Sequence, residues 1–185
     1  MKIGHINLAR SFNGTGEHFV ALIEALERQG IRQHVIVRNK ALAKRIAIYD
    51  RVTLGPVTAS PVMAYCLMPN VDVVHAHDGK SAQSGLLLTL TRSIPFVLTC
   101  RSCANSSANP ISRSIEERAA SLIFCRQDVA DKMLKGSSNP QVNLIADIGR
   151  EEGSNVKTLG NRAAAEHLRV YQRAAGAWSM PALML

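Results

Sequence analysis

The sequence predicts an α/β fold: a doubly wound, mainly parallel sheet of Rossmann-like type in a single domain. Short apolar runs alternate with segments of helical periodicity along most of the chain. The connecting segments are polar and rich in glycine or proline, as expected of loops between sheet and helix. The length of 185 residues suits one buried core rather than two α/β domains.

The individual elements follow from local patterns. Phe19, Leu22, Ile23 and Leu26 recur at helical spacing before Gly30, which predicts a helix with a glycine stop. Strands are expected at 2–8, 34–37, 51–54, 71–77, 95–100, 122–125 and 142–146, and further helices at 41–48, 62–68, 85–92, 111–119, 129–134 and 161–174. We therefore expect a domain at 1–149, a polar linker at 150–160, and a helix with an apolar tail at 161–185.

Charge narrows the class of partner. Lys and Arg number 22 against 14 Asp and Glu, and the net charge of +8 favours an anionic ligand or an acidic membrane surface. Aromatic residues make up only 4%, so a base-stacking surface for nucleic acid is not expected. The start of the chain is too interrupted for a signal peptide, and no run of eighteen apolar residues occurs. We expect a cytoplasmic protein with reduced cysteines.

The first candidate segment lies between the first strand and the first helix. Gly14, Thr15 and Gly16 would let backbone N–H groups approach a phosphate at a helix N-terminus. Phe19 occupies the third glycine position of the dinucleotide fingerprint, so no bound cofactor is expected. A plain turn with a helix cap is the alternative.

The second candidate segment follows the run 71–77. Gly79-Lys80-Ser81 resembles part of a phosphate-binding loop, but Val74 stands at the position of its first glycine. His75 and His77 point to the same face of a strand, and we expect His75 in the core and His77 in contact with a ligand. A metal held by both histidines and Asp78 is the alternative; because no further ligand is predicted nearby, we expect no metal.

The third candidate segment follows the strand 95–100. Arg101 presents a planar cation suited to phosphate or carboxylate, with a surface salt bridge as the alternative. Cys100 and Cys103 form a C-x-x-C pair, but a zinc site needs a second pair, and a redox pair usually follows the first strand. Because ligands bind beyond the carboxyl ends of parallel strands, the three segments should meet along one edge and gather negative charge.

The segments also carry a family resemblance. Asp72 to His77 reads D-V-V-H-A-H, Gly14 to Glu17 is similar to a G-G-x-E loop, and Ile94 to Thr99 is similar to an I-P-x-V-x-T strand. In this order they resemble the N-terminal domain of family 4 glycosyltransferases, which have the GT-B fold. The resemblance extends over roughly residues 1–150. Ala163 to Tyr171 looks like the family's closing helix, which returns to the first domain.

The resemblance implies transfer of a sugar from a nucleotide-sugar donor to an acceptor bound mainly on this domain. Gly14, Thr15, Gly16, Lys80 and Arg101 could then stabilise the leaving diphosphate. Arg101 stands near where many members have a histidine, so histidine-dependent chemistry is not expected there. We expect the domain that holds the nucleotide in the family to be missing. We expect an acceptor-side domain for an envelope polysaccharide or lipid-linked acceptor.

The partners expected are a nucleotide-sugar or phosphorylated acceptor, a separate donor-domain protein or a second copy, and peripheral membrane contact. An alternative is a non-catalytic binding or scaffolding module derived from a glycosyltransferase. A nucleotide-binding regulator or oxidoreductase fits less well, because Arg38-Asn39-Lys40 replaces the acidic residue expected at the ribose.

Overall fold

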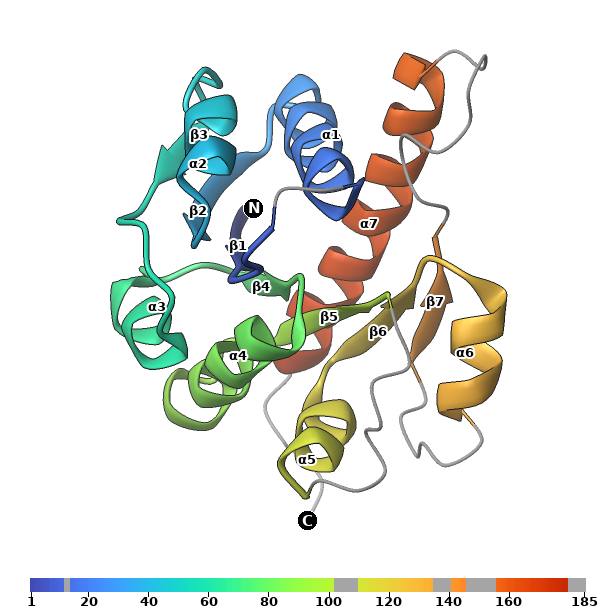
Figure 1. Cartoon of the computed structure of the whole chain (residues 1–185). Helices are drawn as coiled ribbons and strands as arrows, with labels where there is room; N and C mark the ends of the chain where they lie inside the picture. Colours follow the sequence, from blue (N-terminus) through green and yellow to red (C-terminus); the bar gives the residue numbers. More distant parts are fainter. Residues whose placement is uncertain (12–13, 102–109, 135–140, 146–155, 180–185) are drawn as a thin grey trace.

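A computed structural model describes residues 1–11, 14–101, 110–134, 141–145 and 156–179, and it confirms the predicted fold. These residues form a seven-stranded sheet with helices on both faces (Figure 1). The strands are β1 (Lys2–Asn7), β2 (Arg32–Val37), β3 (Val52–Leu54), β4 (Val73–Ala76), β5 (Phe96–Cys100), β6 (Ser121–Phe124) and β7 (Val142–Leu144). The helices are α1 (Gly14–Arg28), α2 (Lys40–Ile46), α3 (Pro61–Leu67), α4 (Gly79–Arg92), α5 (Pro110–Arg118), α6 (Gln127–Leu134) and α7 (Val156–Ser179).

The order of the strands places the candidate segments side by side. It runs β3-β2-β1-β4-β5-β6-β7, and every neighbouring pair is parallel. His5 of β1 lies opposite His75 of β4, which in turn lies opposite Val97 of β5. The strands β1, β4 and β5 therefore end next to one another at the carboxyl edge of the sheet.

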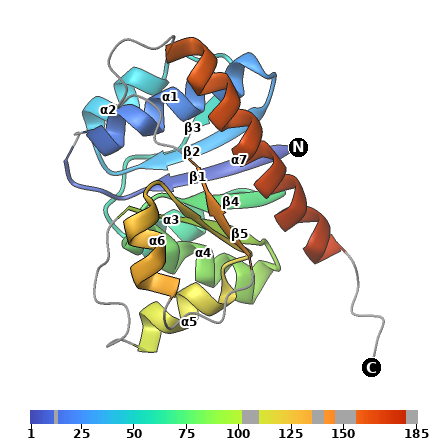
Figure 2. The same cartoon turned by 90° about the vertical axis from the view of Figure 1, so that its right-hand side faces the viewer.

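Two sets of helices cover the two faces of the sheet, and the side chains they bury differ. α1, α2 and α7 lie on one face, and α3 to α6 lie on the other (Figure 2). α7 packs on α1 and on the middle of the sheet through small residues and one large ring, Ala163, Ala164, Ala174 and the fully buried Tyr171. The opposite face buries Phe96, Phe124 and Leu88 in the largest apolar cluster.

Each predicted helix and strand is present, with shifted ends in places. Gly30 has φ +74°, so the glycine stop of α1 is confirmed. α7 begins at Val156, inside the expected polar linker, because a helix that docks through its later turns can continue through a polar segment. The apolar tail 180–185 and Cys103 lie outside the described residues. In the described part of the chain, no helix combines the length and apolarity needed to cross a membrane.

Gly85 allows α4 to pack closely on β5. A Cβ atom at this position would lie 2.7 Å from Cδ2 of Phe96, a ring that is fully buried. The ring cannot swing into solvent, so the helix would have to shift away from the strand.

We predict that Gly85→Ala lowers the free energy of unfolding by about 1–3 kcal/mol, the usual cost of overpacking a core. Gly176→Ala is the matched control, because a Cβ on this exposed position of α7 would meet nothing within 4 Å. Its helix propensity should give a gain of up to about 1 kcal/mol. Urea titration measures the free energy of unfolding of both variants. An equal change in the two would contradict the close packing of α4 on β5.

Candidate functional site

Asp78 organises the junction between β1 and β4 at the carboxyl edge. Its side chain caps α4 by accepting hydrogen bonds from the backbone N–H groups of Lys80, at 2.9 Å, and Ser81, at 3.0 Å. The other carboxylate oxygen accepts the N–H of Leu8 at 2.7 Å and the hydroxyl of Ser81 at 2.6 Å. One carboxylate thus joins the end of β1 to the start of α4 and occupies two amides in the first turn of that helix.

A pocket of about 600 Å³ opens beside this junction. It is lined by Leu8, Ala9, Arg10, Arg38, Asp78, Gly79, Lys80, Gln83 and Ser112. Three of these residues are cations from three different loops: Arg10 follows β1, Arg38 follows β2, and Lys80 lies in the first turn of α4. We call this the cationic pocket.

The three cations have no carboxylate partner among the described residues. The ion pairs of the described part join other residues: Arg28 with Glu24, Arg45 with Glu17, Arg113 with Glu117, Arg126 with Asp128, and Arg162 with Glu166. Arg10 and Lys80 are exposed and Arg38 is half-buried. Because Asp78 already occupies the amides of α4, an anion in this pocket would be bound by side-chain cations rather than by the helix N-terminus.

The predicted site residues lie at the same edge, and Lys80 is the one among them that lines the cationic pocket as the described residues form it. Gly14, Thr15 and Gly16 form the first turn of α1, and Lys80 lines the cationic pocket. Arg101 follows β5 directly and is half-buried. His77 is only 3% exposed, so its contact with a ligand stays a prediction.

His77 belongs to a buried group of histidines beneath the edge. His5, His18, His75, His77 and His167, which we call the histidine cluster, come from β1, α1, β4, the residue after β4, and α7. A hydrogen bond of 3.2 Å joins Nδ1 of His5 and Nε2 of His77. The ring of Phe19 meets that of His77 edge-on, with 4.5 Å between centroids.

His75 is the most fully bonded member of the histidine cluster. A hydrogen bond of 2.6 Å joins its Nδ1 to the hydroxyl of Tyr171 in α7. A second, also of 2.6 Å, joins its Nε2 to Oγ1 of Thr99 in β5. The expectation that His75 is a hydrogen-bonded core residue is therefore confirmed.

Burial keeps these imidazoles neutral. It is the largest cause lowering the pKa of His5 to about 3, with His167 adding to the effect. Burial also holds the pKa values of His75 and His77 well below 6.5, and nearby histidines and Arg101 lower them further. Burial raises the pKa of Tyr171 well above 10. At physiological pH the imidazoles of His5, His75 and His77 are thus neutral donors and acceptors.

The histidines are close enough for a metal to be considered. Nitrogen atoms of His5, His75 and His77 lie within 4.8 Å of one another. However, both nitrogens of His75 are used in hydrogen bonds of 2.6 Å, and a metal would have to displace Thr99 or Tyr171. Asp78, the third ligand considered from the sequence, is occupied as the cap of α4. The arrangement is therefore a hydrogen-bonded network rather than an open ligand set.

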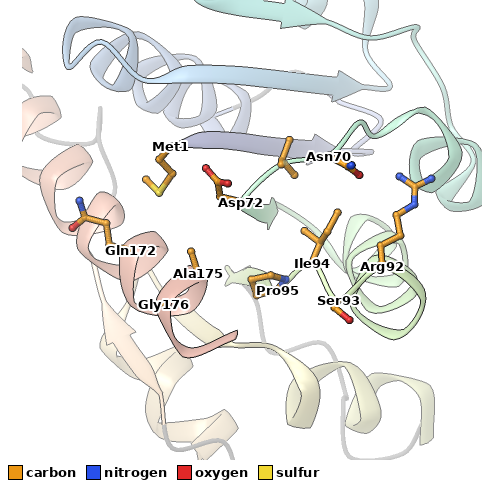
Figure 3. A pocket seen from close by; sticks show the side chains of 11 residues that line it. Met1, Asn70, Asp72, Arg92, Ser93, Ile94, Pro95, Gln172, Ala175 and Gly176 are labelled. Carbon is orange, nitrogen blue, oxygen red and sulfur yellow. The ribbon is translucent and has the colours of Figure 1, made fainter. Parts of the chain in front are cut away.

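A second hollow lies at the opposite, amino edge of the sheet (Figure 3). It measures about 710 Å³, and Met1, Asp72, Pro95, Gln172 and Gly176 are among its lining residues. In doubly wound folds ligands bind beyond the carboxyl ends of the strands, which is the other edge. The cationic pocket is therefore the candidate functional site.

Several residues of the site were missed from the sequence. Arg10 and Arg38 follow strands, and that position was the available signal for both. His5, His18 and His167 stand alone in the sequence, without a partner at motif spacing. Only the fold brings them to His75.

Comparison with known proteins agrees with this architecture. The model of Glycosyltransferase Family 4 matches residues 12–145. A search of curated protein sequences gives no significant match. The structure is similar to that of a sucrose-phosphate synthase from Thermosynechococcus elongatus comprising segments 27–220 and 406–426 (TM-score 0.63, 16% identity, 94% of this chain and 98% of that chain).

Two further similar structures are larger than this chain. Anabaena HepE in complex with UDP and glucose has a TM-score of 0.60 and 12% identity, over 80% of this chain and 44% of HepE. The lipopolysaccharide outer core galactosyltransferase WaaB has a TM-score of 0.53 and 14% identity, over 79% of this chain and 45% of WaaB. The chain thus spans less than half the length of either protein. At these identities the likeness shows the fold, and the family match over most of the chain shows that it belongs to glycosyltransferase family 4.

Proposed function

We propose that this chain is the acceptor-side domain of a nucleotide-sugar-dependent glycosyltransferase, and that its cationic pocket binds an anionic acceptor. The observation that carries the proposal is the convergence of Arg10, Arg38 and Lys80 on one pocket at the carboxyl edge of a family 4 domain. Three cations, which outnumber the single carboxylate of Asp78 in the pocket, are a binding surface for a phosphate or carboxylate. A phosphorylated sugar or lipid-linked intermediate of the cell envelope has this chemistry.

The donor would be held by a second domain. In this proposal residues 1–149 form the acceptor-side domain, and 161–185 include the closing helix, which begins at Val156. The first turn of α1, with Gly14, Thr15 and Gly16, and the cation of Arg101 lie at the same edge as the pocket. They would face the diphosphate of the donor and stabilise its developing charge. HepE is known in complex with UDP and glucose, which supports a nucleotide-sugar as the donor class.

Turnover then requires more than this chain. An open half-cleft neither excludes water nor orients the donor, so transfer should need a separate donor-domain protein or a second copy. A non-catalytic binding module is the alternative function, and it would keep the acceptor pocket without any turnover. The surface charge is also compatible with peripheral contact to an acidic membrane.

We predict that a sugar 1-phosphate binds the cationic pocket and that the corresponding neutral sugar does not. In a ¹⁵N NMR titration, the shifts should centre on residues 8–10, 38 and 79–83. Arg38→Gln and Lys80→Gln should each weaken binding about tenfold, equivalent to about 1.4 kcal/mol, because each removes a charge from the anion. Lys44→Gln, an exposed lysine of α2 outside the pocket, is the control for loss of one charge. If Lys44→Gln weakened binding as much, the loss of affinity would reflect the net charge of the chain rather than the cationic pocket.

We also predict how turnover depends on the concentration of the chain. At dilution, these 185 residues should release no more UDP from UDP-sugars than buffer does, because in this proposal they supply only the acceptor side of the cleft. If a second copy completes the cleft, the turnover per chain rises with concentration. If a donor-domain protein is needed, turnover stays at background until that protein is added. Full turnover by the dilute chain would contradict the acceptor-side assignment.

A further inference from the structure

The histidine cluster is a feature that the proposed function leaves unused. Five of the six histidines of the chain belong to it. Their rings stand in contact in a chain: the centroids of His77 and His75 are 3.8 Å apart, those of His75 and His167 5.6 Å, and those of His167 and His18 6.3 Å. The cluster thus runs from the sheet through α7 to α1.

The cluster lies where α7 docks, and α7 is attached differently from the strands. The strands hold one another through backbone ladders. α7 contacts the sheet through side chains, and three of its buried residues are alanines, which contribute little apolar area each. Among the described residues, the bond between Tyr171 and His75 is the buried polar link of α7 to the sheet, and an exposed one joins Arg173 to Asn143 of β7. Docking of α7 therefore depends on the state of an imidazole beneath it.

The groups around the cluster offer no compensation for a proton. β1 contributes His5, α1 contributes His18 and Phe19, β5 contributes Thr99 with Arg101 after it, and α7 contributes His167 and Tyr171. In the described part of the chain, the charged groups that act on His5, His75 and His77 are other histidines and Arg101, not carboxylates. A protonated imidazole here would be a buried cation among potential cations, which is strongly unfavourable.

We propose that the histidine cluster is an acid-sensitive latch: its neutral imidazoles hold α7 on the sheet, and proton uptake releases α7 while the sheet stays folded. The direction of this pH effect follows from the difference in bound protons between the docked and the released state. Because the pKa values of His5, His75 and His77 lie below that of a free histidine, the released state binds more protons than the docked state below about pH 6.5. Docking is therefore complete above that pH. It weakens as the pH falls toward the docked-state pKa, which is about 3 for His5.

Hydrogen exchange on the full chain tests the latch between pH 7.5 and pH 5.0. Protection factors, the ratios of intrinsic to observed exchange rates, remove the direct effect of pH on exchange. One histidine changes the open population up to tenfold per pH unit, so protection in residues 163–174 should fall at least about 30-fold below pH 6.5. Protection in β1, β4 and β5 should remain. Constant protection in α7, or loss in α7 and the strands together, would overturn the proposal.

Variants separate the latch from general acid unfolding. His75→Gln carries an amide that can bond both Tyr171 and Thr99 but takes up no proton, so it should flatten the pH response of α7. His34→Gln is the control, because His34 is the sixth histidine and lies outside the cluster. Equal responses in the two variants would contradict the proposal. Binding of one Zn²⁺ per chain at pH 7.5 that is lost in His75→Gln would also overturn it, since the nitrogens would then serve a metal.

A second variant keeps the test valid if His75→Gln does not fold. Tyr171→Phe retains the buried ring but removes the hydroxyl bonded to His75, and it should open α7 about tenfold more often at pH 7.5. In Tyr65→Phe the lost hydroxyl bonds only Thr91 near the surface, so α7 should not change. Equal opening of α7 in both would show that the Tyr171 link does not hold the helix.

Discussion

The two hydrogen bonds of His75 join three elements that are distant in sequence. They fix the ring of a β4 residue against Thr99 of β5 and Tyr171 of α7, and both imidazole nitrogens are satisfied without a charge. Thr99 stands two residues before Arg101, and His75 stands three residues before Asp78. The network therefore also sets the positions from which the loops of the carboxyl edge depart. Because the site is built on these loops, its geometry depends on a neutral imidazole in the core.

Asp78 decides what kind of recognition the edge can offer. In a phosphate-binding loop the first amides of the helix are free to hold the ligand. Here a carboxylate occupies them and brings a negative charge to the same place. An anion would therefore be bound by Arg10, Arg38 and Lys80. Their long side chains form a wider binding surface than the backbone amides of one helix turn. Such a surface suits the single charged group of a larger acceptor better than a tightly enclosed triphosphate.

Much of the fold could be predicted from the sequence, because it rests on local patterns. The apolar run at 71–77 and the glycine after α1 predict their elements without any knowledge of neighbours. For the candidate site, only its place at the carboxyl edge of the sheet could be predicted, and not which side chains share a pocket there. Lys80 and Arg101 were predicted because they lie shortly after clear strands, whereas the run Arg38-Asn39-Lys40 fits either a phosphorylated ligand or a solvated turn. The contact of His5 with His77 joins residues 72 positions apart, and no spacing rule reports such a pair. The start of α7 within a polar segment is likewise set by docking of its later turns.

The docking of α7 shows why a core can use histidines where leucines would pack more simply. α7 lies against the sheet and α1, and its side-chain contacts hold it there, because it joins no strand through a backbone ladder. Apolar contacts alone would hold it with little specificity of register. A hydrogen bond from Tyr171 to one nitrogen of His75 fixes the register, since a shift of one residue would leave a buried donor and acceptor unpaired. The hydrogen bond that specifies the position of α7 involves a titratable imidazole, and in the latch proposed above the docking of α7 therefore depends on pH.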